Sequence, residues 1–543
     1  MHEPHSSMTI HGRLVLALLA AGWLGLAIIP TWSFYWSEEP LFSRTALMSI
    51  VVSLALALAA CTVPDRAWRG PPWLGKLVIV AAAGVLAVQF GFRVWQRGAA
   101  VTVLEIFLCT AMLIYMVAVC RRAGQVQSLP AALLLALAML LSGHAVPVVR
   151  LLYPNGPVAV TAIRWLAGAG FLTVCTFTLD LWGGCAPVCD RPLNEQWGPA
   201  ARRRLFWPRV AVLFLTGVGL RAGTVVASPE PLIDVYVWLR DAPGVLLQGE
   251  NPYVAEYDNV YASKQAEFWW GEPVAGPARS RLPAYPPLPM LLALPFRAAG
   301  LDVRCANVLC DLLAALVLLE AGRRRGSPLI GALAAGAYLH CPGAPLMTEQ
   351  AWYEPMIAAT LGGGLLLAER GRRLGYFLIG LGLAGKQYGI AMLPPVARAH
   401  WGRWPSLLVG ILLSGAATAL PFFLWDPHAF LHVVLFSHLD RPTKLNSWTL
   451  QTGAADMFGI SLRPAAFWGL AAGLIGWVAW RTPRNGAGTA LWAGTALLVF
   501  CLCHTQAFFN YFYLCQYLFL LGIVGLAVPK NEEISACGGA GIK

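Results

Sequence analysis

The chain has 543 residues, of which 58% are hydrophobic and only 12% are charged. A soluble globular domain carries roughly 25% charged residues, so this composition excludes an ordinary soluble protein. The formal net charge is +12, but the basic residues lie in short clusters between apolar stretches. Such clusters orient membrane spans, and nucleic-acid binding is therefore a poor interpretation.

Apolar stretches of about 17–25 residues, the length that crosses about 30 Å of hydrocarbon, recur along the whole chain. The first has no small-residue cleavage site, so we interpret it as an uncleaved helix and not as a signal peptide. We predict an all-α polytopic membrane protein with about fourteen transmembrane helices. The predicted spans are residues 13–34, 45–63, 74–92, 101–120, 130–152, 158–182, 206–227, 302–322, 328–346, 350–368, 405–425, 464–481, 488–503 and 507–528.

Every second connection between these spans is basic, which places those connections and both termini in the cytoplasm. Residues 374–397 break the alternation, because basic residues flank both of their ends. We predict two half-helices there that turn back, with Lys386 and Gln387 near the tip. Such side chains are tolerated at membrane depth only in a protein interior or a polar cavity. Residues 286–300 are too short to span, and we predict a re-entrant or interfacial helix.

The connections divide the chain into unequal parts. We predict an N-terminal six-helix module (1–182), a cytoplasmic linker (183–205), a helical body (206–528) with long extracytoplasmic loops at 228–285 and 426–463, and a cytoplasmic tail (529–543). Two long loops on one face indicate that the function lies on that face.

The first long loop carries the most informative residues. Asp234 follows a span directly, and Asp241 would share its face if this segment is helical. Gly249 to Tyr253 is a turn signal, and Tyr285 precedes two prolines. The aromatic residues of this loop suit either an interfacial belt or sugar stacking. Taken alone, Asp234 would more often be a solvated loop carboxylate, and it is the order of the surrounding features that favours a catalytic role.

Two polar groups near the C-terminus leave their roles open. Cys501, Cys503 and His504 are metal-ligand types, but no second pair lies nearby, so we predict no metal site. Further along the chain, Gln506, Asn510, Tyr511 and Tyr513 lie on otherwise apolar segments. Hydrogen bonding between helices explains this second group as well as substrate binding does.

The order of these features resembles the GT-C glycosyltransferases, over about residues 205–528. The nearest likeness is to the bacterial polyprenyl-phosphate-mannose-dependent mannosyltransferases. In both, an Asp follows a helix in an extracytoplasmic loop, and Pro-Tyr and Tyr-Pro-Pro motifs come after it. The positions that carry the resemblance are Asp234, Gly249, Asn251, Pro252, Tyr253, Tyr285, Pro286, Pro287, the Glu349-to-Glu354 motif and the Gly385-to-Gly389 hairpin. This chain differs in having six extra spans before the loop.

The resemblance implies transfer of a mannose-like hexose from a polyprenyl-phosphate carrier to a hydroxyl group. The acceptor would be a glycolipid, a polysaccharide or a protein at the extracytoplasmic face of a bacterial inner membrane, and no cofactor is implied. Asp234 would be the general base of a direct, inverting displacement. Retention would need a second carboxylate, and Asp241 would be about 10 Å away along a helix.

The remaining candidates would bind the substrates. They are Asp241, Asn251, Tyr253, Tyr285, Glu349, Glu354, Lys386, Gln387, His438, Arg441 and Lys444. Lys386 would stabilise the leaving phosphate, unless pairing with Glu349 or Glu354 makes it structural. Arg441 and Lys444 would bind the same phosphate or merely contact lipid head groups.

Two other functions compete with glycosyl transfer. A transporter or flippase for a lipid-linked sugar predicts matching broken helices in two halves and short loops on both faces. A non-catalytic membrane scaffold would use the first six helices as its interaction module. The long loops on one face favour the enzyme.

Overall fold

The structure is a computed structural model, and its described part is helical apart from one short pair of strands. It describes residues 17, 20–21, 50–59, 157–183, 199–262, 279–280, 285–341, 343–437, 447–459, 464–484 and 488–526. The predicted spans 74–92, 101–120 and 130–152 lie outside these residues, as do most of 13–34 and the ends of 45–63.

The longer helices follow the apolar stretches. They are α8 (Pro157–Gly183), α10 (Pro199–Ala227), α14 (Cys305–Arg324), α15 (Pro328–Leu339), α17 (Glu354–Ala368), α18 (Arg373–Ala384), α19 (Gly389–Ala399), α20 (Trp404–Thr418), α25 (Pro464–Arg481), α26 (Thr489–Cys503) and α27 (Phe509–Leu526). Among the described residues, three segments are long and apolar enough to cross a membrane: Leu205–Ala227, Cys305–Arg324 and Phe509–Leu526. A helical membrane protein is thus supported, while the number fourteen stays a prediction.

Shorter elements connect these helices. They are α11 (Asp234–Leu247), β1 (Tyr257–Asp258), η2 (Val260–Ala262), β2 (Arg279–Ser280), α13 (Pro287–Ala298), α16 (Ala344–Glu349), η3 (Trp401–Arg403), α21 (Leu420–Trp425), α22 (Pro427–Leu431), η4 (His432–Phe436) and α24 (Leu450–Phe458). Strands β1 and β2 pair antiparallel, with Tyr257 opposite Ser280. Helix α13 confirms the short helix expected at 286–300.

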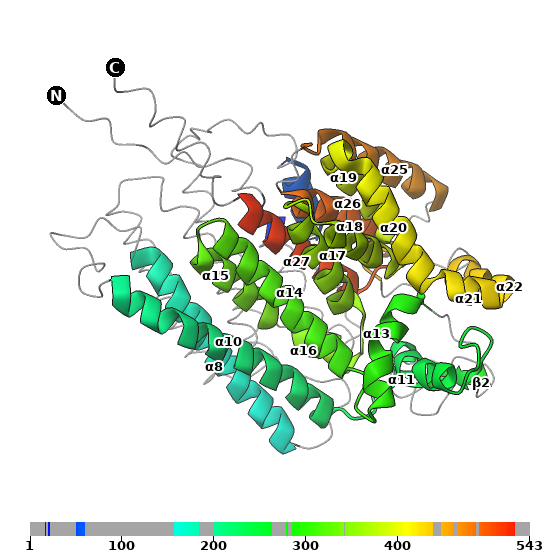
Figure 1. Ribbon diagram of the computed structural model, residues 1–543. Helices are drawn as coiled ribbons and strands as arrows, with labels where there is room; N and C mark the ends of the chain where they lie inside the picture. Colours follow the sequence, from blue (N-terminus) through cyan, green and yellow to red (C-terminus); the bar gives the residue numbers. More distant parts are fainter. Residues whose placement is uncertain are drawn as a thin grey trace.

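The helices form one bundle (Figure 1). Helix α8 packs on α10, α14 on α15, and α17 on both α14 and α18. Figure 1 shows α11, α13, α21 and α22 gathered together, away from the middle of the bundle. The described residues 228–262, which include α11 and β1, belong to this end.

Glycine contacts bring two of these helix pairs close together. A methyl group added at Gly364 on α17 would lie 2.6 Å from the amide nitrogen of Ile379 on α18. One added at Gly322 on α14 would lie 2.5 Å from Gly331 on α15. Small residues at helix interfaces are typical of membrane bundles, where packing replaces the hydrophobic effect.

The predicted hairpin at 374–397 is confirmed. Helices α18 and α19 are separated by a break at residues 385–388. The chain then returns to its starting level, since the rings of Tyr376 and His400 lie 5.6 Å apart and Arg403 donates to the carbonyl of Ala368 at 3.4 Å. Lys386 and Gln387 therefore stand at the tip.

Two predicted spans are divided in the structure, and one helix begins before its predicted span, 206–227, which agrees with the apolar segment Leu205–Ala227. Span 328–346 is interrupted after Leu339, since Gly343 and Pro345 begin a new helix, α16. Span 405–425 is divided at Ala419, where Pro421 supplies no amide proton to continue the ladder. Helix α10 begins at Pro199, inside the predicted linker.

Candidate functional site

Asp234 is the first residue of α11, at the end of the bundle where α13, α21 and α22 also lie. Ile233 before it is extended, and Oδ1 of Asp234 accepts a hydrogen bond from the amide of Val235 at 2.8 Å. The side chain is half-buried. A helix N-terminus is a favourable place for a carboxylate.

A buried arginine holds the segment that leads to Asp234. The Arg304 guanidinium donates to the carbonyl oxygens of Ser228 at 2.6 Å and Pro229 at 3.2 Å. It also pairs with Asp302 at 2.7 Å and lies 5.0 Å from the centre of the Tyr236 ring. The side chain is fully buried. Arg304 therefore fixes the start of α11 to the start of α14.

Asn251 and Tyr253 link this loop to Tyr285. The Oδ1 of Asn251 accepts from the amide of Tyr253 at 3.0 Å, which closes the turn after Gly249. The Tyr253 hydroxyl donates to the carbonyl of Tyr285 at 3.0 Å. Burial raises the pKa of Tyr253 well above its ordinary value, so the hydroxyl stays a neutral donor. Both side chains support Tyr285, and their contact with a substrate stays a prediction.

Lys386 forms the centre of the site. Its Nζ donates to Oε1 of Glu354 at 2.8 Å, and both side chains are buried. The same oxygen accepts from the Tyr388 hydroxyl at 3.0 Å and from Nδ2 of Asn510 at 2.7 Å. Of the two carboxylates expected as partners for Lys386, Glu354 is the one that forms the pair. Glu349 instead accepts from Nε2 of Gln350 at 3.4 Å.

Four tyrosine rings surround the Lys386 ammonium. Their centres lie between 4.5 and 5.9 Å from Nζ, distances at which a ring face attracts a cation. The rings are those of Tyr285, Tyr353, Tyr388 and Tyr511. The rings of Tyr285 and Tyr353 also meet edge to face at 4.8 Å. The loop on which Tyr285 lies is therefore joined directly to the hairpin tip.

The other candidates lie around this centre or apart from it. Gln387 donates to the carbonyl of Val434 at 2.8 Å, which ties the hairpin tip to η4. Asp241 pairs with Arg240 at 2.7 Å, and this hydrogen bond raises the pKa of the guanidinium. His438, Arg441 and Lys444 lie outside the described residues, shortly after η4.

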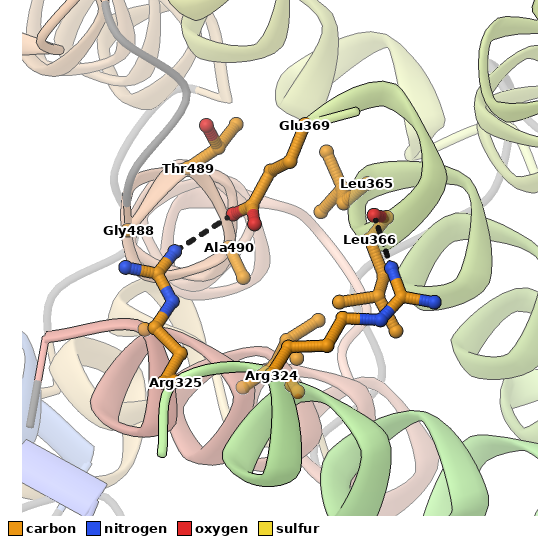
Figure 2. A pocket seen from close by; sticks show the side chains of 11 residues that line it. Arg324, Arg325, Leu365, Leu366, Glu369, Gly488, Thr489 and Ala490 are labelled. Carbon is orange, nitrogen blue, oxygen red and sulfur yellow. Dashed lines mark hydrogen bonds and ion pairs between the residues drawn. The ribbon is translucent and has the colours of Figure 1, made fainter. Parts of the chain in front are cut away.

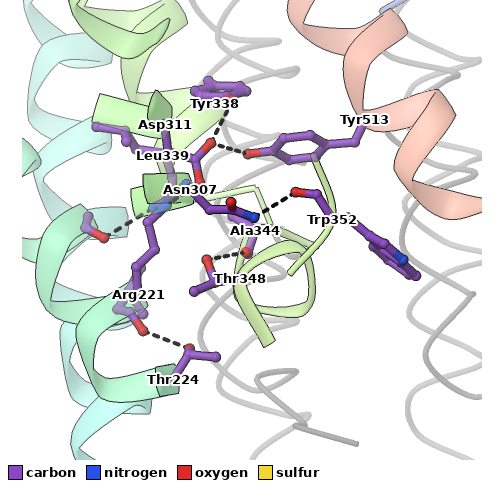
Figure 3. A network of polar contacts seen from close by, with 12 residues as sticks. Arg221, Thr224, Asn307, Asp311, Tyr338, Leu339, Ala344, Thr348, Trp352 and Tyr513 are labelled. Carbon is purple, nitrogen blue, oxygen red and sulfur yellow. Dashed lines mark hydrogen bonds and ion pairs between the residues drawn. The ribbon is translucent and has the colours of Figure 1, made fainter. Parts of the chain in front are cut away.

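Sequence reasoning missed a second buried ion pair, shown in Figure 3. Arg221 on α10 donates through Nε to Asp311 on α14 at 2.6 Å, and both side chains have no exposed surface. The other oxygen of Asp311 accepts from the hydroxyls of Tyr338 at 2.6 Å and Tyr513 at 3.4 Å. The sequence did contain a signal for this pair, because Arg221 and Asp311 are opposite charges within two predicted membrane spans.

A small cavity lies at the far end of the bundle (Figure 2). It has a volume of about 30 Å³, and Arg324, Arg325 and Glu369 line it. Arg325 pairs with Glu369 at 3.1 Å. Glu354 and Glu369 are at opposite ends of α17, about 22 Å apart at 1.5 Å per residue. The cavity is therefore separate from Lys386.

Residues 284–505 match the model of glycosyltransferase family 87. The match indicates a membrane glycosyltransferase, which agrees with the coarser part of the resemblance seen in the sequence. It spans less than half of the chain; it includes Tyr285, Glu354 and Lys386 and begins after Asp234. No curated protein and no solved structure matches the chain.

Among the described residues, no group of three His, Cys, Asp or Glu side chains is placed to hold a metal ion.

Proposed function

We propose that this protein transfers a mannose-like hexose from a polyprenyl-phosphate carrier to an acceptor hydroxyl at the extracytoplasmic membrane surface. The observation that carries the proposal is the buried Lys386 at a hairpin tip, joined through Tyr285 and Tyr253 to helix α11, which begins at Asp234. A cation at the tip of a membrane hairpin suits a phosphate carried by a lipid, and the family match supports sugar transfer.

Lys386 would stabilise the charge of the leaving phosphate. An ammonium has three N–H donors, and Glu354 takes one of them at 2.8 Å. The other two face an environment of tyrosine rings, which attracts the cation without replacing a hydrogen-bond acceptor. A phosphate oxygen supplies such an acceptor.

The reaction would be a single displacement. The acceptor oxygen forms a bond to the anomeric carbon as the bond from that carbon to the phosphate oxygen breaks. The electron pair leaves with the polyprenyl phosphate, and the proton of the acceptor passes to Asp234. One displacement inverts the anomeric configuration. The partner of Asp241 is Arg240 at 2.7 Å, and this pairing disfavours Asp241 as the nucleophile of a retaining reaction.

The test uses the full-length protein in proteoliposomes with a glycolipid and polysaccharide extract as the acceptor pool. Labelled prenyl-phosphate mannose is compared with prenyl-phosphate glucose and with the corresponding nucleotide sugars. We expect transfer only from a prenyl-phosphate sugar, with an inverted linkage in the product. Transfer from the nucleotide sugars alone, or none from any donor, would overturn the proposal.

A further inference from the structure

Two adjacent residues at the start of α17 each bury a polar atom that has no hydrogen-bond partner among the described residues. These atoms are the hydroxyl of Tyr353 and Oε2 of Glu354. Tyr353 is 1% exposed and Glu354 is fully buried. An unsatisfied buried polar group is destabilising, so two of them side by side require an explanation.

The two oxygens of Glu354 differ sharply. Oε1 accepts three hydrogen bonds, from Lys386, Tyr388 and Asn510, at 2.7 to 3.0 Å. A carboxylate that served only to neutralise Lys386 would have no need to leave its other oxygen bare. The three donors instead fix the carboxylate in one orientation, which leaves Oε2 preorganised as an acceptor.

We propose that Tyr353 and Glu354 form a subsite that binds the ring hydroxyls of the donor sugar. A bare carboxylate oxygen accepts a hydrogen bond, and a tyrosine hydroxyl both donates and accepts one, as does each hydroxyl of a pyranose. The faces of the neighbouring Tyr285 and Tyr353 rings give apolar surface of the kind on which sugar rings pack. This inference rests on the proposed function, since it identifies what the site binds.

The position of the subsite agrees with the order of groups in the donor. The ring of Tyr353 is 5.9 Å from Nζ of Lys386, and it also meets the ring of Tyr285, whose carbonyl accepts from Tyr253 in the loop that follows α11. The sugar lies between the acceptor hydroxyl and the phosphate during transfer. With Asp234 at the acceptor and Lys386 at the phosphate, the sugar lies beside Tyr353.

The loop before Tyr353 is held rigidly. Nδ2 of Asn307 on α14 donates to the carbonyl of Trp352 at 2.7 Å (Figure 3). Ala351 has a positive φ of 54°, a left-handed conformation that is unfavourable for a non-glycine residue. Backbone strain of this kind is found most often at functional sites, where the surrounding contacts maintain it.

A second tyrosine provides a matched control. The hydroxyl of Tyr376 on α18 is also buried without a partner among the described residues. Tyr376 is likewise 1% exposed, but it packs on the ring of His400 at the opposite end of the hairpin from Lys386. Replacing either tyrosine by phenylalanine removes one oxygen atom and no hydrogen bond to the described residues.

The experiment measures binding of short-chain prenyl-phosphate mannose and of its monodeoxy analogues. The full-length Asp234→Asn variant is used as the background, so that no turnover occurs. In this background we expect Tyr353→Phe to raise the donor Kd about fivefold, the value of one net hydrogen bond, and Tyr376→Phe to leave it unchanged. For one monodeoxy donor, the Kd for the background variant should be about fivefold higher than the Kd of the complete donor. For Tyr353→Phe, the Kd values of that deoxy donor and of the complete donor should be equal, because the hydroxyl and its partner form a single hydrogen bond.

Equal Kd values for the background variant and Tyr353→Phe with every donor would overturn the subsite, and so would equal shifts in Tyr353→Phe and Tyr376→Phe. The thermal midpoint of each variant reports folding independently. Transfer by the wild-type protein is measured separately. If the Kd shifts appear but the wild type transfers no sugar, the subsite stands and the proposed enzymatic function fails.

Discussion

The body of this protein contains two buried ion pairs that differ in how completely they are satisfied. Both oxygens of Asp311 are occupied, one by Arg221 and the other by two tyrosine hydroxyls. In Glu354, one oxygen accepts three hydrogen bonds, and the other has no hydrogen-bond partner among the described residues. Among the described residues, Arg221 lacks a partner only at Nη2.

The two pairs also differ in what they join. Arg221 and Asp311 hold together α10 and α14, and Arg221 also donates to the carbonyl of Leu339 on α15 at 3.0 Å. Lys386 and Glu354 lie where a hairpin tip meets the start of α17, within a ring of tyrosines. The comparison suggests a distinction by carboxylate: the fully hydrogen-bonded Asp311 fixes helices, whereas Glu354, with one oxygen bare near loops, fits the proposed ligand subsite.

The largest effect that we expect is a loss of stability when the Arg221–Asp311 pair is broken. Asp311→Asn leaves the Arg221 charge buried without a counter-charge, which costs about 3–5 kcal/mol. Thermal unfolding in detergent should therefore show a strongly lowered midpoint. Asp258→Asn, which changes a mostly exposed carboxylate, serves as the control and should leave the midpoint unchanged. An unchanged midpoint in Asp311→Asn would remove the structural role from this pair.

Neutral double variants separate the two pairs by function. Replacement of a buried ion pair by neutral groups of similar size is often tolerated. Arg221→Met with Asp311→Leu should therefore fold and keep transfer activity within about threefold of wild type. Lys386→Met with Glu354→Gln should also fold, but its turnover should fall about hundredfold because the leaving phosphate loses its cation. Similar activities for the two double variants would make the distinction wrong.

A smaller effect is expected at Arg304, which holds the start of α11. Arg304→Lys keeps the charge but loses the planar fork that reaches Ser228, Pro229 and Asp302 together. A displaced Asp234 should lower kcat about tenfold and leave the donor KM unchanged. Arg323→Lys, at an exposed ion pair on α14, is the matched control. If the donor KM rises and kcat is kept, Arg304 acts on donor binding instead.

The sequence predicted much of the fold because membrane spans are read from composition. Apolar stretches defined α8, α14, α25, α26 and α27 closely, and flanking arginines revealed the hairpin before its contacts were known. Prolines decided where the predictions failed, since a span interrupted at Pro345 or Pro421 has the same composition as a continuous one.

The candidate site was predictable only in part. Charged residues stand out at membrane depth, so Lys386 and Glu354 could be named as possible partners. The tyrosines around them could not, because Tyr353, Tyr388 and Tyr511 come from three distant segments and an aromatic residue is common at any interface. The bare oxygen of Glu354 depends on the direction of three donors, which no spacing along the chain encodes.

The central claim is that Asp234 takes the proton from the acceptor hydroxyl, and one rate measurement tests it most directly. Initial transfer from labelled prenyl-phosphate mannose is compared in proteoliposomes that hold wild type, Asp234→Asn or Asp241→Asn at equal protein and saturating donor. We predict that Asp234→Asn is slower by at least about hundredfold with an unchanged thermal midpoint, and that Asp241→Asn stays within about threefold of wild type. Equal rates for wild type and Asp234→Asn would contradict the account.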